Sequence, residues 1–402
     1  MIQAPDFSPI LLDEYQGFTS KTDRNSRLGI GGIGFVLLGL FGEVGSLLSE
    51  LKKKQRDKNG GLAYHDLVVE ELGDTLWYFS NAALRAGFSL SVLANRIPKE
   101  IDGWQYRGRE NAVSFSDLQC NKSNFSGPSE SNDVEQRLLG LAGKVGLFIE
   151  DYNKTKGNFE HATLTKVMVD IFHALVIAAD ISNVSLNEAA RRNMTKAASR
   201  WPLEPDLSKR DWGVLYDENL DPDEQIPRRI EMIFREKEIQ GKTYVIQQCK
   251  GIKIGDRLTD NRTESDDYRF HDVFHLAYAA ILGWSPVVRA LFKVKRKSDP
   301  VIDENQDGAR AIIIEEGVST WMFNHGLRHN HFENVSSIEY PLLKAVHDFI
   351  KGYEVETRPL WQWEHAILEG FRIFREIRKP EYRGGTVVAD LINRTIIFHS
   401  SK

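Results

Sequence analysis

Acidic residues lie inside two apolar segments with helical spacing, and this combination constrains the fold more than any other feature of the chain. The segments are residues 39–50 and 69–78. Their acidic side chains are Glu43, Glu50, Glu70, Glu71 and Asp74. Glu43 and Glu50 share one helix face, and buried carboxylates are costly unless they are paired or bind a metal. Two such helices facing each other predict a hard-cation site, because oxygen ligands suit Mg²⁺ and Mn²⁺.

Length and composition set broad limits on the protein. The 402 residues suffice for two or three domains, and a formal charge of −5 gives no general attraction to nucleic acid or anionic membranes. Cys120 and Cys249 are too few for a disulfide framework and fit a reducing compartment. The first residues lack a signal-peptide pattern, and the glycine-rich apolar run 30–40 is too short to span a bilayer. We therefore expect a cytoplasmic protein without a membrane or nucleic-acid partner.

The chain changes character twice along its length. Residues 113–133 are rich in Ser and Asn, and residues 205–226 are rich in Pro and Asp, so both are expected to be linkers. The segments before them, 1–112 and 134–204, have helical patterns throughout. Residues 227–402 are expected to form an α+β domain with a small antiparallel sheet.

The expected sheet rests on four runs of residues. Residues 228–239 and 243–249 alternate around Gln240-Gly241-Lys242, which predicts a β-hairpin. The β-branched runs 386–391 and 394–399 at the end of the chain are expected to add two strands. The predicted fold class is therefore mainly α, with this sheet confined to the C-terminal domain.

The two helical segments repeat each other. Residues 39–45 (Gly-Leu-Phe-Gly-Glu-Val-Gly) match residues 140–146 (Gly-Leu-Ala-Gly-Lys-Val-Gly). Two further pairs match downstream: 73–76 with 169–172, and 87–90 with 183–186. At the matched positions the second segment has Lys144 in place of Glu43, Lys166 in place of Glu70 and Val167 in place of Glu71. The aspartate is kept, since Asp170 matches Asp74. Such self-similarity predicts two tandem helical repeats that form a pseudo-dimer with one working site.

At these residues the chain resembles the MazG-type nucleotide pyrophosphohydrolases, an all-α family. The family pattern is a helix carrying EExxE, a loop, and a helix carrying ExxD. Here Glu71-Leu-Gly-Asp74 matches ExxD, and the following Leu-Trp-Tyr is typical of the family. On the first helix the family glutamates correspond to Gly42, Glu43 and Ser46, so only Glu43 is retained.

A further family element is an Asn followed by a Lys on the next helix. Asn193-Met-Thr-Lys196 matches it in the second repeat, and Asn95-Arg-Ile-Pro-Lys99 is a looser match in the first. The resemblance covers roughly residues 25–205. It implies two MazG-like repeats, the first with the acidic site and the second degenerate, followed by a C-terminal extension.

The resemblance implies attack of water on a nucleoside triphosphate (NTP or dNTP) at the link between the α and β phosphates. The products are a nucleoside monophosphate and pyrophosphate, and the cofactor is Mg²⁺ or Mn²⁺. We expect Glu43, Glu71 and Asp74 to be the metal ligands, with Glu50 or Glu70 as an auxiliary ligand or base. The expected substrate contacts are Lys53, Lys54, Trp77, Lys99, Asn193 and Lys196.

Several of these residues have ordinary alternatives. Glu50 with Lys53 and Lys54 is also a common surface pairing on a helix. Glu70 alone fits a solvated position better than a catalytic one, and Trp77 also fits the core. Asn193 and Lys196 fit substrate contact and surface positions equally well.

A second group of candidate ligands lies in the C-terminal third. His271 and His275 are one helical turn apart, which suits two ligands of one metal. Asp272 lies beside the first histidine, and Glu315 and Glu316 follow on an apolar helix. Mixed nitrogen and oxygen ligands suit a second divalent metal, although a lone histidine on an apolar helix is more often a hydrogen-bonded core residue.

Three hypotheses follow from these patterns. The first is a Mg²⁺-dependent nucleotide pyrophosphohydrolase. The second is a nucleotide sensor with weak or no turnover that controls a C-terminal metal-dependent hydrolase acting on nucleotides or nucleic acid. The third is a structural assembly protein with vestigial sites. A homo-oligomer is possible under all three, because family members assemble through helix faces.

Overall fold

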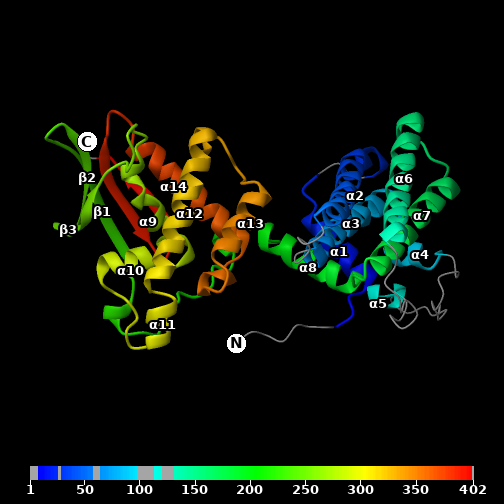
Figure 1. The fold of residues 1–402 in the computed structure, drawn as a ribbon, viewed down its shortest axis with the longest axis horizontal. Helices are drawn as coiled ribbons and strands as arrows, with labels where there is room; N and C mark the ends of the chain where they lie inside the picture. The colour runs from blue at the N-terminus through cyan, green and yellow to red at the C-terminus, as the bar shows by residue number, and fades with distance from the viewer. Residues whose placement is uncertain (1–7, 26–28, 58–63, 98–112, 120–130, 401–402) are drawn as a thin grey trace. The chain divides into compact units, whose positions relative to one another are not determined.

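The computed structural model describes residues 8–25, 29–57, 64–97, 113–119 and 131–400. The chain forms two compact units, Met1–Leu203 (unit 1) and Glu204–Lys402 (unit 2), each of which is described separately (Figure 1). Lys99, an expected substrate contact, lies outside the described residues.

Unit 1 is built from helices. They are α1 (Leu12–Thr22), α2 (Ile33–Arg56), α3 (Tyr64–Arg85), α4 (Leu90–Ala94), α5 (Phe115–Leu118), α6 (Ser131–Thr155), α7 (His161–Ile181) and α8 (Leu186–Arg200). Within the described residues, α2 packs on α3 and α6, α3 packs on α8, and α6 packs on α7. Helix α1 lies across α3 and α8.

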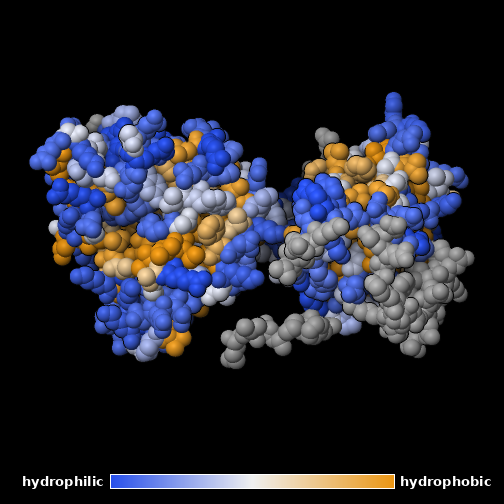
Figure 2. Space-filling view, viewed as in Figure 1, coloured by the Kyte–Doolittle hydropathy of each residue, from blue (hydrophilic) through white to orange (hydrophobic). Residues whose placement is uncertain are grey.

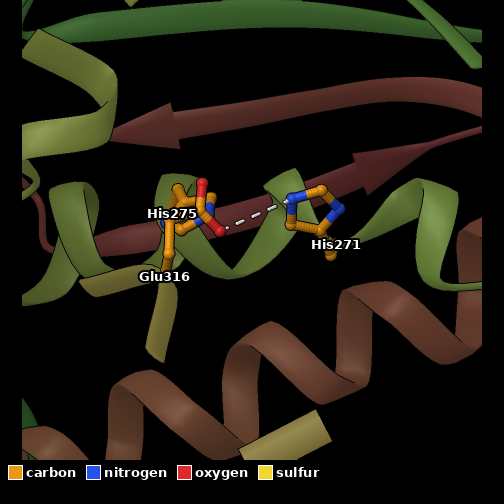
Figure 3. A group of neighbouring side chains, drawn as sticks. All are labelled: His271, His275 and Glu316. Carbon is orange, nitrogen blue, oxygen red and sulfur yellow. Dashed lines mark ion pairs between the residues drawn. The ribbon is translucent and has the colours of Figure 1, made fainter. Parts of the chain in front are cut away.

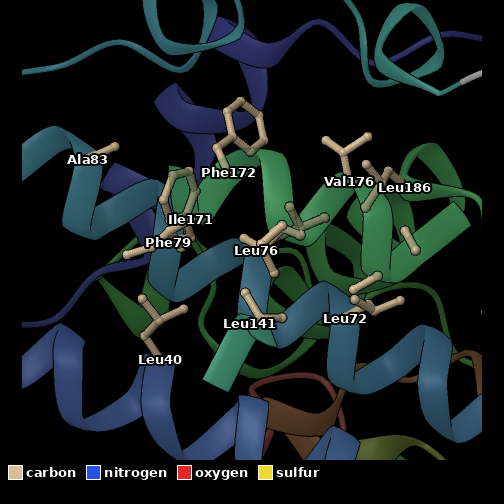
Figure 4. Packing of buried hydrophobic residues seen from close by; sticks show 14 of the residues in the cluster. Leu40, Leu72, Leu76, Phe79, Ala83, Leu141, Ile171, Phe172, Val176 and Leu186 are labelled. Atoms are coloured by element: carbon tan, nitrogen blue, oxygen red, sulfur yellow. The ribbon is translucent and has the colours of Figure 1, made fainter. Parts of the chain in front are cut away.

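Both halves of unit 1 contribute to one hydrophobic core. Figure 4 shows Leu40, Leu72 and Phe79 from the first half close to Leu141 and Phe172 from the second half. The rings of Phe79 and Phe172 lie 5.1 Å apart between centroids. The two halves therefore depend on each other for burial. Whether they are a true tandem repeat and a pseudo-dimer stays a prediction.

By length and composition alone, α2 and α7 could cross a membrane, and the bent helix pair Tyr268–Leu282 and Pro286–Phe292 of unit 2 could count as a third span. Within the most apolar stretch of each helix, 39% of α2 and 61% of α7 is buried against the rest of the chain. Some apolar side chains of α2 and α6 remain exposed, as Figure 2 shows over unit 1: Phe35, Leu38, Phe41, Leu139 and Leu147. A homo-oligomer that covers this face stays a prediction.

Unit 2 combines a sheet with helices. Its strands are β1 (Arg229–Ile239), β2 (Lys242–Cys249), β3 (Ile252–Leu258), β4 (Gly384–Asp390) and β5 (Thr395–His399). Its helices are α9 (Asp272–Leu282), α10 (Pro286–Phe292), α11 (Pro300–Asn305), α12 (Ala309–Arg328), α13 (Tyr340–Phe349) and α14 (Leu360–Ile377). The strands form one antiparallel sheet in the order β3-β2-β1-β4-β5.

Two tight turns set the register of the first three strands. Gln240 and Gly241 have φ of 53° and 72°, and Lys250 and Gly251 have φ of 49° and 80°. Positive φ at both central residues is the geometry of the two-residue turns that match strand twist. The mainly α fold with a small antiparallel sheet is confirmed, while β3 was not expected from the sequence.

The helices of unit 2 are layered on one face of the sheet. Ile230, Met232 and Phe234 alternate along β1 and are buried. Helices α9 and α14 pack on each other and on β4 and β5, and α12 packs on α9, α10 and α13 (Figure 1). Every residue of α9 is buried, so this helix is the centre of unit 2.

The segment 205–226 differs from the linker expected at the sequence level. Leu215 and Ile226 belong to the core of unit 2. The buried carboxylate of Asp217 pairs with Arg289 over 2.8 Å. Since these contacts bury apolar and charged groups together, the segment packs as part of unit 2. Residues 113–119 likewise include a helical turn, α5, where a linker was expected.

Candidate functional site

Three of the expected carboxylates converge in unit 1. Glu43 on α2 and Glu71 and Asp74 on α3 each offer an oxygen, and these oxygens lie within 4.8 Å of one another. The side chains are half-buried, because α2 and α3 pack along their apolar faces and leave the carboxylates at the rim of that contact. An all-oxygen group of this kind suits Mg²⁺ or Mn²⁺.

The electrostatics of this group favour a bound cation. Burial, together with the charges of Asp74 and Glu71, raises the pKa of Glu43 to about 8. Burial also raises the pKa of Glu71, although its hydrogen bond with Glu43 opposes that shift. In the metal-free protein, Glu43 and Glu71 thus share a proton. A divalent ion would remove the same repulsion, so the donor set fits such an ion.

Helix α8 supplies the neutral and basic groups beside the carboxylates. Asn193 donates a hydrogen bond from Nδ2 to Asp74 Oδ1 over 3.0 Å. Lys196 Nζ pairs with Asp74 Oδ2 at 2.5 Å and with Glu70 Oε1 at 3.1 Å. The structure therefore brings the Asn-Lys element of the second half to the acidic residues of the first half. Glu70 lies at the edge of the group, beside Lys196.

Two residues that sequence reasoning missed hold α8 in place. Buried Tyr15 donates a hydrogen bond from its hydroxyl to Asn193 Oδ1 over 3.0 Å, so the amide of Asn193 turns its Nδ2 toward Asp74. At Gly73, an added Cβ would lie 2.6 Å from the carbonyl oxygen of Ala189 on α8. The absence of a side chain at Gly73 thus permits the close approach of α3 and α8. Nothing in the sequence pattern distinguishes Tyr15 from other core residues.

Tyr78 lies against the other side of the group. Burial raises the pKa of its hydroxyl, and the nearby charges of Glu43 and Asp74 add to that rise. Its ring packs on α2 at Gly39, where an added Cβ would lie 2.1 Å from the ring. Tyr78 stays half-buried and has one side toward the carboxylates.

Other expected site residues lie away from these carboxylates. Glu50 is buried and pairs with Lys53 over 2.5 Å, and it is seven residues, or about two helical turns, from Glu43. Lys54 lies over the ring of Tyr64, 4.2 Å from its centroid. These positions do not support Glu50 as an auxiliary ligand or Lys53 and Lys54 as phosphate contacts, because two turns of helix separate Glu50 from Glu43 and the lysines lie further along.

Trp77 also has a different environment from the one expected for base stacking. Its side chain is buried, and its indole N–H donates to Thr22 Oγ1 over 2.9 Å. Its ring meets that of Tyr78 edge to face. Because the indole N–H of Trp77 has its hydrogen-bond partner inside the core, we infer that this residue packs the core.

A second group of candidate ligands converges in unit 2. His271, which caps the start of α9, His275 on α9 and Glu316 on α12 offer ligand atoms within 4.8 Å of one another, and Figure 3 shows their side chains pointing together. Glu315 is fully buried and accepts a hydrogen bond from His275 Nδ1 over 2.9 Å. Asp272 Oδ1 lies 3.1 Å from His271 Nε2. All five residues expected in this region are therefore close together. His271, His275 and Glu316 form the group itself, and Glu315 and Asp272 each contact one of its histidines.

The protonation of this second group is coupled. Burial lowers the pKa of His275, but Glu315 and Glu316 outweigh burial and raise it well above its usual range. Burial raises the pKa of Glu316, but its hydrogen bond with His275 and the charges of both histidines lower it overall. A positive charge is therefore stabilised at this position.

Comparison with known proteins gives a family match in unit 2. Residues 212–402 match the family described as the MazG C-terminal domain. The Gene 37 protein of Mycobacterium phage L5 is 33% identical over 81 residues, which cover 20% of this chain and 71% of the phage protein. No solved structure matches the chain. The matched C-terminal domain shows that this chain belongs to the MazG-like family.

Proposed function

We propose that unit 1 is a divalent-metal-dependent nucleotide pyrophosphohydrolase of the cytoplasm. Water would attack an NTP or dNTP at the α–β link and give a nucleoside monophosphate and pyrophosphate. Membership of the MazG-like family points to nucleotide-pyrophosphohydrolase chemistry and to divalent metals in general terms. The observation that supports this assignment here is the convergence of Glu43, Glu71 and Asp74 beside Lys196.

Each residue has a defined part in this proposal. Glu43, Glu71 and Asp74 would hold Mg²⁺ or Mn²⁺, which neutralises phosphate charge and lowers the pKa of water when it is bound. Burial and its acidic neighbours raise the pKa of Glu43 to about 8, so Glu43 is suited to take the proton from the attacking water. Asn193 fixes Asp74, and Tyr15 in turn fixes Asn193.

Lys196 would supply positive charge to the substrate phosphates. In the metal-free protein its ammonium group neutralises Asp74 and Glu70. With a metal bound at Asp74, the ammonium group of Lys196 would pair with a phosphate oxygen of the substrate. Among the expected lysine contacts that the structure describes, Lys196 lies at the carboxylates, whereas Lys53 and Lys54 do not.

Hydrolysis by the full-length protein tests the proposal. The eight common NTPs and dNTPs are incubated with Mg²⁺ or Mn²⁺, and pyrophosphate release is measured. Asp74→Asn removes one metal-ligand charge with little change in shape, and we expect it to abolish release. Asp170→Asn, at the matched position of the second half, is the control and should retain activity. Equal release by wild type and Asp74→Asn, or none by either, would contradict the proposal.

A nucleotide sensor is the second candidate function. One observation favours it: of the three family glutamate positions on α2, only Glu43 carries a carboxylate, and Glu50 lies too far along the helix to replace the others. Fewer ligands weaken metal binding and slow hydrolysis, while nucleotide binding persists. Calorimetry separates the two functions, because nucleotide binding without pyrophosphate release supports the sensor.

A further inference from the structure

The two histidines of unit 2 present nitrogen atoms to the same carboxylate oxygen. His275 Nε2 lies 3.5 Å from Glu316 Oε2, and His271 Nε2 lies 3.9 Å from that same oxygen (Figure 3). The histidines are four residues apart at the start of α9, and Glu316 comes from α12. The three ligand atoms thus surround a point that two packed helices fix.

The opposite nitrogen of each ring has a hydrogen-bond partner that fixes the ring. His271 Nδ1 lies 2.9 Å from the carbonyl oxygen of Tyr268, which can only accept, so Nδ1 carries the proton. The ring of Tyr268 stacks on His271, with 4.3 Å between centroids and an interplanar angle of 2°. His271 Nε2, the other ring nitrogen, lies 3.1 Å from Asp272 Oδ1 and 3.9 Å from Glu316 Oε2, so it is the ring atom that faces the carboxylates and would hold a metal.

His275 is fixed by a carboxylate in the same way. Its Nδ1 lies 2.9 Å from Glu315 Oε1. Glu315 also accepts from Ser285 Oγ over 2.6 Å and from the backbone N–H of Val287 over 2.8 Å. A carboxylate that two other donors hold and that in turn orients a histidine is the usual outer-shell support of a metal-bound imidazole.

One buried nitrogen in this arrangement has only a long polar contact among the described residues. His275 is fully buried, and its Nε2 lies 3.5 Å from Glu316 Oε2, longer than an ordinary hydrogen bond. Burial of a ring nitrogen without a good hydrogen bond is unfavourable. The atom points at the Glu316 oxygen and at the space shared with His271, so a ligand there would satisfy it.

We propose that His271, His275 and Glu316 bind one transition-metal dication, with Glu315 as the residue that positions His275. Two imidazoles and one carboxylate favour Zn²⁺, Fe²⁺, Co²⁺ or Mn²⁺ over Mg²⁺. The site is distinct from the all-oxygen group of unit 1, so this chain has two metal sites of different chemistry. The proposal stands independently of the pyrophosphohydrolase assignment.

The site has the character of a reactive centre rather than of a structural one. Structural zinc sites have four protein ligands, whereas catalytic sites have three and leave a position for water or substrate. The Glu316 side chain is 40% exposed, so the ion is reachable from solvent on that side. Asp272 Oδ1 lies 3.1 Å from His271 Nε2, and Gln247 donates to its other oxygen. Asp272 is thus a carboxylate beside the ion that can hold a metal-bound water.

The competing interpretation is a doubly protonated His275 between Glu315 and Glu316. That arrangement would be a buried ion pair with no metal. It explains the contact of His275 with Glu315, and a protonated His271 would likewise pair with Asp272 over 3.1 Å. Metal binding distinguishes the two, because an imidazolium ion cannot ligate.

Binding of Zn²⁺ and Co²⁺ by the full-length protein tests the proposal. Metal-free protein is dialysed against Zn²⁺, and bound metal is counted; Co²⁺ is then titrated while its visible absorption is recorded. The variants are His271→Ala and Glu316→Gln. The second variant removes a ligand at a partly exposed side chain. Two controls are His329→Ala, an exposed histidine after α12, and Asp74→Asn in unit 1.

We expect one Zn²⁺ with nitrogen-ligand Co²⁺ bands in the wild type, His329→Ala and Asp74→Asn. His271→Ala and Glu316→Gln should lose the Co²⁺ bands, and their Zn²⁺ affinity should fall more than about 100-fold. The Zn²⁺ affinity of Glu315→Gln should fall about 10- to 100-fold. Circular dichroism must show folded protein in each case. The proposal is overturned if folded Glu316→Gln keeps wild-type Zn²⁺ affinity and Co²⁺ bands, or if the wild type binds neither ion.

Discussion

Asn193 donates a hydrogen bond to Asp74 over 3.0 Å, although the two residues are 119 positions apart in the chain. This bond joins the half of unit 1 that carries Glu43, Glu71 and Asp74 to the half that carries Asn193 and Lys196. The second half is therefore more than a scaffold: α8 provides the amide and the ammonium group beside the carboxylates. The integrity of the candidate site depends on how closely α8 approaches α3.

Replacing Lys196 by Met should separate metal binding from nucleotide turnover. The change removes the ammonium group that competes for Asp74 and keeps the aliphatic stem. Metal affinity should be unchanged or higher, while kcat/KM for the best nucleotide should fall about 10- to 100-fold, or about 1.4–2.7 kcal/mol. Calorimetry with Mn²⁺ and initial rates measure the two effects.

Lys166→Met is the matched control for this change. Lys166 is an exposed lysine on α7 at the position that corresponds to Glu70. It should leave both measurements unchanged. A fall in metal affinity in Lys196→Met, with turnover unaffected, would argue against a phosphate-binding role for Lys196.

Gly73→Ala should move α8 away from the site. The new methyl group would lie 2.6 Å from the carbonyl oxygen of Ala189, a backbone atom that cannot turn aside. We expect a loss of about 1–3 kcal/mol in the free energy of unfolding and a loss of pyrophosphate release. Urea denaturation and the hydrolysis assay measure these effects.

Gly143→Ala is the control for the same chemical change in a helix. Gly143 lies within α6, and an added Cβ there meets nothing within 4 Å. Alanine should stabilise that helix by up to about 1 kcal/mol and leave activity intact. If both variants were equally stable and active, close packing at Gly73 would not control the position of α8.

The raised pKa of Glu43 predicts a pH-dependent effect of metal on stability. Its pKa is about 8 in the folded protein against a usual value of 4.5, so between these pH values the folded state binds more protons than the unfolded state. Metal-free unit 1 should therefore lose stability as pH rises through this range. Mg²⁺ must displace the proton, so its affinity should increase toward pH 8.

Thermal denaturation with and without Mg²⁺ at several pH values tests this linkage. The gain in Tm on adding Mg²⁺ should be larger near pH 8 than near pH 6. Glu43→Gln, which cannot ionise, should remove the pH dependence as well as most of the gain. A gain that is the same at every pH would show that Glu43 does not exchange its proton for the metal.

The parts of the fold that were predictable are those with local sequence signals. The apolar period of α2 and α3 and the ExxD spacing placed Glu43, Glu71 and Asp74 on facing helices. Gln240-Gly241 indicated the first hairpin. Strand β3 gave only a short signal, because the alternation of Ile252, Lys253 and Ile254 stops at Gly255 and the strand is an exposed edge of the sheet.

The long-range contacts were not predictable from spacing. Tyr15 reaches Asn193 across 178 positions, and only the packing of α1 on α8 brings them together. In the same way, the order of Glu315 and Glu316 does not reveal which one supports His275 and which one faces solvent. The orientation of α12 against α9 decides that, through the burial of Glu315 beside Ser285.

The basic run 293–297 illustrates the same limit and leads to a last prediction. Four of its five residues are basic, yet the Arg296 side chain is buried and pairs with Asp307 and Glu354, each at 2.7 Å. Arg296→Met leaves the fully buried Asp307 without this partner, so unit 2 should lose about 3–5 kcal/mol of stability. Lys297→Met, at an exposed neighbour, should change stability by less than about 0.5 kcal/mol. Denaturant unfolding of the two variants measures the difference, and equal stabilities would show that the Arg296 ion pairs contribute nothing to unit 2.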